Sequence, residues 1–377
     1  MLSNPNHAPA PSQMLPLYDD AMSVDEQSEL ASIMSGSYGF ARPASSVTSN
    51  SEMMRPASPA RSLLSMTDSR LAASFRQEYG RHLNNYSEVY RLPADDEELT
   101  RLNKQHLMFQ RVMGKYPPGL EEVLTPDNVE TKTVVDLGCG SGSWIFDVAR
   151  DFPESSCLAI DLVPMQSTSM PPNCRSEVDD INLGLQHYFG QFNVVHSRLV
   201  CTGVKDYPGL VDQIALVLRS RGLLSLTEHN FYVYGEDKKQ IMGDDFNPNG
   251  PFLPQWMAVA RNAMRRHGAD VDAAHRLHEW VKDHPDFEDT IYRDFWLPVS
   301  PWKKGDDAET RVFNEVGEAC REDLTAFLES GRPLLLSAGV KESFLNELET
   351  KARREMEEAR TPLYVLVENV VARRKRW

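Results

Sequence analysis

Three glycines alternate with small residues directly after a short apolar run, in the segment TVVDLGCGSGSW at Thr133–Trp144. Such glycines, beginning with Gly138 and Gly140, let the backbone approach a ligand closely, which is typical of a nucleotide or cofactor loop. The dinucleotide pattern G-x-G-x-x-G is not met, because the third glycine, Gly142, comes one residue early and Ser143 follows it. A Walker loop would need Gly-Lys-Ser/Thr, which this loop lacks.

Carboxylates stand at the ends of three successive predicted strands: Asp136, then Asp161, then Asp179 and Asp180. Asp136 would repel a diphosphate but can serve the cationic amino-acid portion of S-adenosylmethionine (SAM), directly or through water. In the same interpretation Asp161 accepts the ribose hydroxyls, and Asp179 or Asp180 accepts the adenine amino group. The first two glycines would pass under the ribose and methionine parts. Each acid alone is equally well explained as a loop cap, but three at successive strand ends favour a SAM site.

Strand, turn and helix alternate after Lys132. The predicted strands are 133–137, 156–161, 174–179, 192–198 and 221–229, with helices at 143–152 and 207–220. Short apolar strands that alternate with helices predict a parallel sheet with helices on both faces.

The second half of the chain departs from this order. Two helices, 251–268 and 272–283, form an insert at about 247–289. Strands at 289–300 and 363–375, separated by helices at 315–330 and 340–360, complete a sheet of about seven strands. The closing RRKRW is basic, and we interpret it as a solvated terminus or a nuclear-import element.

Three regions follow from the composition: a tail over 1–70, a helical cap over 71–130 and the main domain over 131–377. The tail is rich in Ser, Pro, Met and Ala, so it buries too little apolar surface to offset its ordering entropy and is predicted to be disordered. It contains RPAS twice, at Arg42 and Arg55, which suits a linker or a kinase-regulated segment. In the cap we predict helices over 71–93 and over 95–114, the second with acidic residues in its first turn.

Charge and cysteine content exclude several classes of protein. The formal net charge of −15 argues against a surface that binds nucleic acid directly. The five cysteines form no CxxC pair, so a zinc site is not expected, and their scattered, odd number suggests a reducing compartment. Neither a secretory signal nor an apolar run long enough to span a membrane is recognisable.

Further motifs resemble those of the class I SAM-dependent methyltransferases, and within them the fungal LaeA-like group, named for a velvet-complex regulator of secondary metabolism. The resemblance covers residues 90–235 well and the remainder loosely. It is carried by YRLPADDEELTRLNKQH from Tyr90, DLGCGSGSW followed by Asp147, DLVPMQ, PPNCRSEVDD, FNVVHSR, and Glu228 in LTEH.

This resemblance implies an α/β, Rossmann-like, seven-stranded methyltransferase fold with an N-terminal helical cap and a helical insert. SAM would lie across the carboxyl ends of the first four strands, with the segment from Tyr90 to His106 folded over it. The residues assigned to the cofactor are Tyr90, Asp136, Gly138, Cys139, Gly140, Asp161, Leu162, Asp179, Asp180 and Ile181. Cys139, Ser141 and Ser143 depart from the Thr and Ile common in the family's loop, but they are small or polar and should leave binding intact.

Candidates for the methyl-transfer end are His196, Arg198, Glu228 and His229, with Tyr232 beside them. Either histidine can act as a base or simply be packed, because its pKa lies near working pH. Arg198 can orient an anionic substrate or pair with Glu228. Aromatic residues of the second half either wall an apolar pocket or form ordinary core; these are Trp256, Trp280, Phe295, Trp296 and Trp302.

Two functions remain open from the sequence, and a third is disfavoured. The chain is an active methyltransferase on a small-molecule or protein acceptor, or a nuclear LaeA-like regulator that binds SAM and acts mainly through a velvet-type protein partner. A nicotinamide oxidoreductase is disfavoured by Asp136 and Ser143. We expect a cytoplasmic or nuclear location, or both.

Overall fold

The computed structural model describes residues 68–376 except 128, 166–169 and 244–246. The tail predicted over 1–70, with both RPAS motifs, therefore lies outside the described residues, apart from the three residues that begin helix α2 (Asp68–Ala73). In the described part, no helix is long and apolar enough to cross a membrane.

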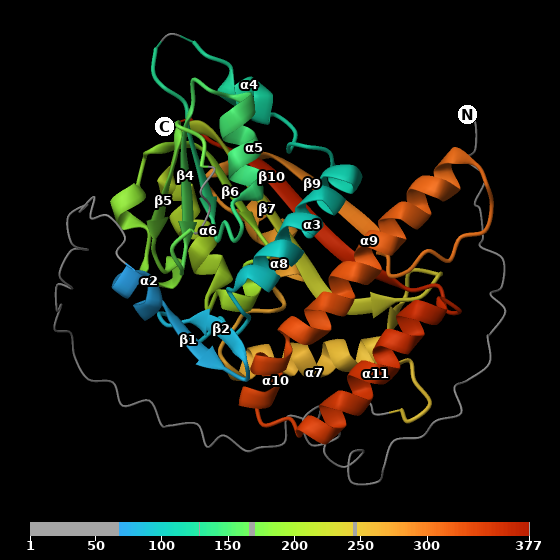
Figure 1. Cartoon of the computed structure of the whole chain (residues 1–377). Helices are drawn as coiled ribbons and strands as arrows, with labels where there is room; N and C mark the ends of the chain where they lie inside the picture. Colours follow the sequence, from blue (N-terminus) through green and yellow to red (C-terminus); the bar gives the residue numbers. More distant parts are fainter. Residues whose placement is uncertain (1–67, 128, 166–169, 244–246, 377) are drawn as a thin grey trace, which may run out of the picture.

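A single large sheet forms the centre of the molecule (Figure 1). Its path runs in the order β5-β4-β3-β6-β7-β10-β9, and the short β8 (Gln240–Ile241) pairs with the end of β7. The strands are β3 (Thr133–Leu137), β4 (Ser156–Asp161), β5 (Cys174–Val178), β6 (Phe192–Arg198), β7 (Leu218–Tyr234), β9 (Phe287–Pro298) and β10 (Tyr364–Arg374). The first five of the path are parallel, whereas β10 runs antiparallel to both its neighbours. The α/β class and the central sheet are as predicted.

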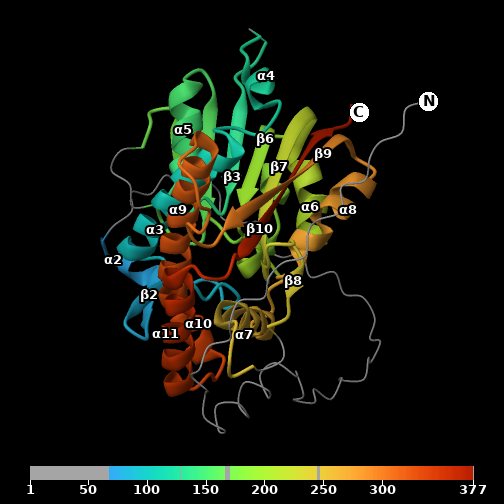
Figure 2. The same ribbon diagram turned by 90° about the vertical axis from the view of Figure 1, so that its right-hand side faces the viewer.

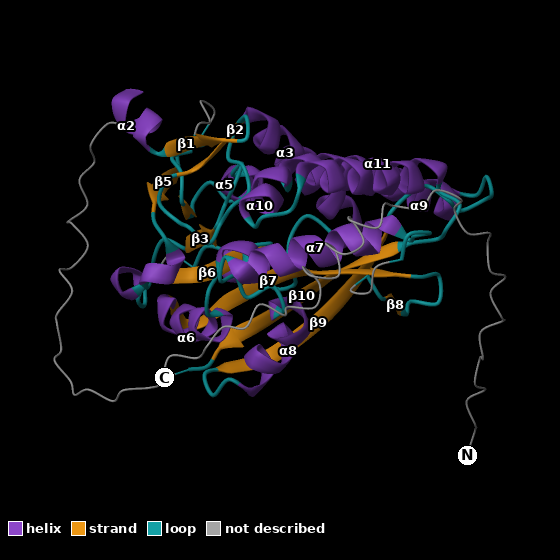
Figure 3. Ribbon diagram, turned by 90° about the horizontal axis from the view of Figure 1, so that it is seen from below, coloured by secondary structure: helices purple, strands orange, loops and turns teal. Residues whose placement is uncertain are grey.

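Helices cover both faces of this sheet. Figures 2 and 3 show α3 (Asp96–Met113), α5 (Ser143–Asp151) and α9 (Ala308–Ser330) on one side, and α6 (Tyr207–Val217) and α8 (Ala273–Asp283) on the other. The remaining helices are α4 (Leu120–Leu124), α7 (Phe252–Arg266), α10 (Arg332–Ser337) and α11 (Glu342–Glu358). The predicted insert helices thus exist as α7 and α8, while α9 begins earlier than predicted.

Consecutive residues of the central strands enter two separate cores, because side chains alternate between the faces of a sheet. Val134 and Val194 pack with Trp144 of α5, whereas Val135 and Val195 join the larger core that includes α6 and α7. By the same alternation, the residues two positions after Val134 and Val194 also face α5.

The helix predicted over 71–93 is wrong. Apart from the end of α2, this segment forms a β-hairpin of β1 (Phe75–Glu78) and β2 (Arg81–Asn84). Tyr79 and Gly80 both have positive φ, +49° and +78°, which is the geometry of a tight two-residue hairpin turn. A left-handed pair in the middle of the segment ends any helix there.

Part of the basic C-terminal segment RRKRW is not the solvated terminus that one of its two interpretations predicts. Arg373 and Arg374 belong to β10, where Arg373 pairs with Glu122 at 3.0 Å and Arg374 with Asp286 at 3.0 Å. Arg374 is only 1% exposed. Two of the four basic residues are therefore structural, and Trp377 lies outside the described residues.

Candidate functional site

A cavity of about 210 Å³ lies at the carboxyl ends of β3, β4, β5 and β6 and over the middle of β7. This edge is where ligands bind in open α/β sheets. Helices α3 and α9 cover it. All the residues predicted for cofactor or catalysis except Tyr232 line this one cavity: Tyr90, Asp136, Gly138, Cys139, Gly140, Asp161, Leu162, Asp179, Asp180, Ile181, His196, Arg198, Glu228 and His229.

The glycine loop connects β3 to α5 in a conformation that other residues adopt only with strain. Gly138 and Gly140 have φ of +72° and +54°. A Cβ at Gly138 would lie 2.5 Å from Cγ1 of Val200, and one at Gly140 would lie 2.9 Å from Cδ1 of Leu102. Val200 and Leu102 both line the cavity. Because the glycines have no Cβ, these two side chains can keep their positions in the cavity wall.

Asp161 closes the loop from the side. Its Oδ2 accepts the Gly140 N–H at 2.8 Å, and its Oδ1 accepts the Val163 N–H at 3.3 Å. Burial raises the pKa of Asp161 to about 6, although the backbone donors oppose this rise. The carboxylate is thus held rigidly at the cavity wall, with further lone pairs left for a ligand.

The two acids after β5 differ in how they are engaged. Asp179 accepts the Asp180 N–H on Oδ1 at 2.9 Å, and its Oδ2 lies 2.8 Å from Nε2 of His187. Asp180 accepts both N–H groups of Asn182 on Oδ1, at 2.9 and 2.8 Å, and no described residue binds its Oδ2. Asn182 also donates to the Gly203 carbonyl, which ties this wall of the cavity together.

Asp136 and His196 form a buried pair on the α5 face. Nδ1 of His196 lies 2.7 Å from Oδ1 of Asp136, and both residues are almost fully buried. Because a carboxylate only accepts, the proton lies on Nδ1, and neutral His196 presents Nε2 as an acceptor. Trp144 stacks on the ring with centroids 3.7 Å apart, and burial lowers the pKa of His196.

Arg198 does not pair with Glu228. Its one hydrogen bond goes from Nη2 to Nδ1 of His106 at 3.3 Å, and its guanidinium lies 5.1 Å from the ring centre of Phe109. Burial lowers its pKa to about 10, so the group stays charged at neutral pH. No carboxylate among the described residues lies within ion-pair distance of it.

Glu228 has two unlike oxygens. Its Oε1 accepts the N–H groups of Val200 and Cys201 at 3.0 and 3.1 Å and the hydroxyl of Tyr207 at 2.9 Å. Its Oε2 is buried and has no hydrogen-bond partner in the described part of the chain. Burial raises the pKa of Glu228 to about 7. One oxygen therefore anchors the loop after β6, and the other remains without a protein donor.

His229 lines the cavity through a ring beside Phe231, 4.8 Å between centroids. Its Nε2 is buried without a partner among the described residues, and burial lowers its pKa to about 4. Tyr232 does not reach the cavity; the Arg261 guanidinium lies 4.1 Å from its ring centre.

The apolar wall comes from residues that we had not predicted. The suggested aromatic residues Trp256, Trp280, Phe295, Trp296 and Trp302 do not line the cavity, nor do the described residues of the insert at 247–289. Instead Phe109 of α3, Phe231 of β7 and Phe327 of α9 do.

A buried polar clasp joins α3 to α9 over the cavity. Arg101 donates from Nη2 to Oε1 of Glu98 at 2.6 Å and from Nη1 to Oδ1 of Asp323 at 2.7 Å. The hydroxyl of Ser330 donates to Oε2 of Glu98 at 2.6 Å. All four side chains are largely buried, so the clasp fixes the helix from the C-terminal half against the N-terminal cap. The contacts of Arg101 with Asp323 and of Ser330 with Glu98 join residues more than 200 positions apart, and no local sequence pattern predicts them.

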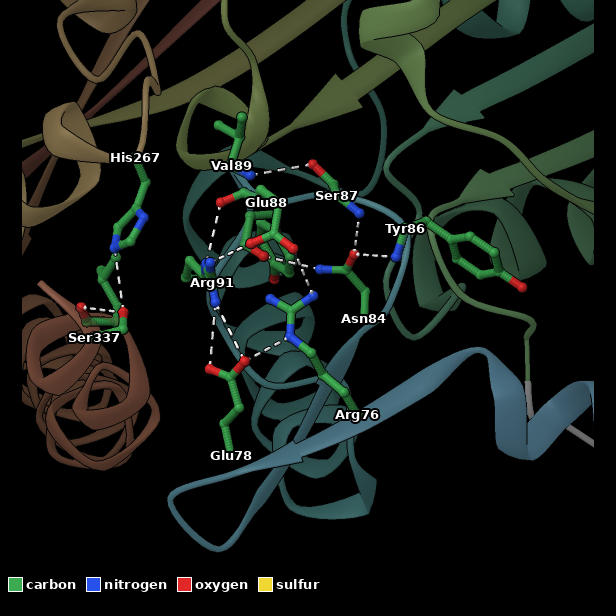
Figure 4. Close-up of polar contacts among 12 residues, drawn as sticks. Arg76, Glu78, Asn84, Tyr86, Ser87, Glu88, Val89, Arg91, His267 and Ser337 are labelled. Atoms are coloured by element: carbon green, nitrogen blue, oxygen red, sulfur yellow. Dashed lines mark hydrogen bonds and ion pairs between the residues drawn. The ribbon is translucent and has the colours of Figure 1, made fainter.

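Asn84, at the end of the hairpin, holds the segment that carries Tyr90. Figure 4 shows its side chain between the backbone groups of this turn: Oδ1 accepts the Tyr86 and Ser87 N–H groups at 3.1 and 2.7 Å. Nδ2 donates to the Tyr90 carbonyl at 2.8 Å. Arg91 fastens the same segment to Glu78 of β1 by contacts of 3.3 Å. The sequence does not predict that Asn84 holds the Tyr90 segment, because this stretch is predicted to be a helix.

Comparison with known proteins gives consistent matches. Residues 106–287 match the family described as "Methyltransferase domain". The chain is 41% identical over 302 residues to "Secondary metabolism regulator laeA" of Coprinopsis cinerea, covering 79% of this chain and 74% of that protein. It is 26% identical over 242 residues to "Protein-methionine methyltransferase laeA" of Emericella nidulans, covering 63% and 60%.

Solved structures give a more distant likeness. A Haemonchus contortus N-methyltransferase in complex with phosphomonomethylethanolamine and S-adenosylhomocysteine aligns with a TM-score of 0.42 at 13% identity, over 78% of this chain and 61% of that chain. Among the described residues, no group of three or more His, Cys, Asp or Glu is arranged to hold a metal ion.

Proposed function

This chain belongs to the LaeA-like class I methyltransferases, and from that premise we propose which part of its cavity binds the methyl donor and which part binds the acceptor. The protein is a SAM-dependent methyltransferase linked to secondary metabolism, and its methyl acceptor is unidentified. We assign the ends of β3, β4 and β5 to the donor and the region around Arg198, Glu228 and His229 to the acceptor.

The residues of the donor end fit SAM. Carboxylates gather there and no described lysine lines the cavity, which favours a cationic ligand over a diphosphate. The positive φ of Gly138 and Gly140 leaves the loop open to close approach. SAM, when bound, supplies a methyl group on a sulfonium that is already a good leaving group.

Each acid then has a separate task. Asp161, fixed by the loop, accepts the ribose hydroxyls. Asp180 is the better partner for the adenine amino group, because its Oδ2 is unengaged while both oxygens of Asp179 already have partners. Asp136 keeps one oxygen for the amino-acid portion, since His196 occupies the other. The rest of the donor wall consists of Tyr90, Cys139, Leu162 and Ile181.

At the acceptor end, the protein mainly aligns the reacting atoms. A base is needed only where the nucleophile is a weak acid such as a hydroxyl. His196 suits that task better than His229, because Asp136 orients its ring and leaves Nε2 free to take a proton. Nε2 of His229 has no hydrogen-bond partner among the described residues, and burial lowers the pKa of this residue to about 4. Arg198 would hold a polar or anionic part of the acceptor.

The observation that carries this proposal is the gathering of the strand-end acids and the Asp136–His196 pair in one cavity. Calorimetry should detect SAM binding to the full chain and its loss in Asp161→Ala. NADH binding in its place would overturn the assignment. Transfer of labelled methyl from SAM into a cell lysate, followed by identification of the labelled product, then gives the acceptor; SAM binding without any label would argue against turnover.

A second role, as a regulator of secondary metabolism, is supported by the name of the Coprinopsis cinerea relative. We extend this role to a velvet-type protein partner and a nuclear location on the family resemblance alone. An import element at the C-terminus would have to use Lys375 and Arg376, because Arg373 and Arg374 are ion-paired within β10. Imaging of the tagged chain with both residues replaced by alanine tests this. Unchanged nuclear location would remove the C-terminal element from the proposal.

A further inference from the structure

A polar row crosses four strands on the α5 face of the sheet. Arg198 of β6 is in register with Thr227 of β7, Thr227 with Asn369 of β10, and Asn369 with Arg293 of β9. Side chains at one register level of neighbouring strands share a face. An arginine thus stands at each end of this row, and a hydroxyl and an amide lie between them.

A second cavity, of about 30 Å³, lies over this row. It adjoins the main cavity, since Phe109, His196 and Arg198 line both. Its other walls come from the end of α3, residues 114–117, Trp144, Ser225 and the rest of the row. No described Asp or Glu lines it, although the chain has 55 acidic residues against 40 Lys and Arg.

Arg293 at the edge of the row has only neutral partners. Its Nε and Nη2 donate to Oδ1 of Asn369 at 3.1 and 2.8 Å, and its Nη1 donates to the Met113 carbonyl at 3.4 Å. The Asn369 amide donates in turn to Oγ1 of Thr227 at 2.9 Å. No carboxylate in the described part of the chain pairs with Arg293, and burial lowers its pKa.

Arg198 is equally without a carboxylate, because its hydrogen bond goes to a neutral group. A guanidinium only donates, so Nδ1 of His106 must carry a lone pair, and its proton is on Nε2, which donates to Asp147 at 3.0 Å. Asp136 is the acid whose charge acts on Arg198, but one of its oxygens is held by His196. The remaining cation of this cavity, Lys115, pairs with Asp151 at 2.5 Å.

Two arginines therefore line one small space that no Asp or Glu of the described residues lines. Partly buried charges without counter-charges are costly, so a small anion between them would be stabilised by both. The space exceeds the roughly 10–15 Å³ that one water requires, so it suits a halide or a single carboxylate group rather than a phosphate ester. We propose that this second cavity is an anion site, which takes a halide- or carboxylate-sized anion between Arg198 and Arg293.

The anion has two conceivable sources with the same chemistry: a free ion, or the carboxylate of SAM bound in the adjoining main cavity. A bromide soak of crystals of the full chain tests the site itself. An anomalous peak between the two arginines is expected, and the absence of a peak at bromide concentrations that label surface sites would overturn the proposal.

Melting in solution provides an independent test. Replacing gluconate by chloride at equal ionic strength should raise the melting temperature by about 1–3 °C. Arg293→Met should lose that rise, whereas Arg221→Met, at an exposed arginine paired with Glu288 at 3.2 Å, should keep it. Equal rises in both variants would contradict an anion site at Arg293.

Calorimetry of SAM then distinguishes the sources. If a ligand carboxylate occupies the site, chloride should compete and weaken SAM binding in the native chain but not in Arg293→Met. If the ion is free, SAM affinity should be independent of chloride while the rise in melting temperature persists. Because bromide and melting report on the site without turnover, this proposal can fail while the proposed methyl transfer stands.

Discussion

Replacement of Gly138 by alanine tests whether the loop must be bare at this position. Two costs arise there. The backbone φ of +72° is unfavourable for an L-residue, and the new Cβ would lie 2.5 Å from Cγ1 of Val200. To restore an ordinary contact of 3.4 Å, Val200 must retreat by about 0.9 Å (3.4 − 2.5). Val200 lines the cavity and is anchored through its N–H to Glu228, so its movement changes the wall.

The two costs can be separated by a matched variant. Gly190 has a similar φ of +67°, but a Cβ there meets nothing within 4 Å. Gly190→Ala should therefore cost only the left-handed strain of about 1–2 kcal/mol. Gly138→Ala should add overpacking of about 1–3 kcal/mol. If the whole overpacking free energy is lost from the free energy of SAM binding, the affinity for SAM falls by roughly 5- to 150-fold.

Two measurements on the purified full chain decide the matter: the melting temperature and the SAM dissociation constant by calorimetry. Gly138→Ala should melt at least about 2 °C below Gly190→Ala and bind SAM more weakly, while Gly190→Ala should bind as the native chain does. If the two variants lose stability equally and bind SAM equally, the close contact with Val200 does not shape the cofactor site, and the reasoning fails.

The affinity for SAM should rise as pH increases through about 6, the raised pKa of Asp161, and level off above pH 7, because the proposed ribose contact needs the carboxylate; a flat calorimetric profile from pH 5 to 8 would contradict that contact. Asn84→Ala should lower the free energy of unfolding by about 1–3 kcal/mol and weaken SAM binding through Tyr90. Asn85→Ala, which loses one exposed hydrogen bond to the Ala73 carbonyl, should cost less stability in urea unfolding and leave SAM binding unchanged in calorimetry. Glu228 has a folded pKa of about 7 against an ordinary value of 4.5, so the folded state binds the extra proton between these values. This group should accordingly contribute a loss of about 1–3 kcal/mol of stability as pH rises from 5 to 8. Glu228→Gln should reduce the slope in urea titrations by that amount and leave the part that comes from Glu355 and Asp161, whose pKa values burial also raises.

Local patterns were enough to predict the parallel half of the sheet. Val134 and Val135, like Val194 and Val195, belong to short apolar runs whose residues fill a core on each face. The hairpin was not predicted, because its two strands are only four residues each and polar, and the decisive signal was the left-handed pair at Tyr79 and Gly80. A positive φ at tyrosine is not visible in an amino-acid pattern.

That the strand-end residues share one cavity could be predicted, because strand ends meet at one edge of a parallel sheet. The helices α3 and α9 that cover the cavity could not be predicted to meet there. Phe327 and Asp323 lie in a helix whose partner, α3, is more than 200 residues earlier, and only tertiary packing brings Arg101 against Asp323. Pocket walls were expected from the insert at 247–289 and from the cap. The cap supplies Phe109, whereas the insert helices α7 and α8 pack against α11, α10, α6 and the sheet.

The charges of the cavity are divided in a way that bears on selectivity. Asp161 and Asp180 stand at the β4 and β5 end, whereas Arg198 stands at the β6 end with no paired carboxylate among the described residues. Because interactions between charges are strengthened where water is excluded, a ligand whose hydroxyl and amino donors meet Asp161 and Asp180, and whose carboxylate lies toward Arg198, has one favourable orientation here. A uniformly anionic nucleotide would have to place phosphates against the acids. The arrangement of charges, more than the shape of the glycine loop, therefore distinguishes this cavity from a dinucleotide site.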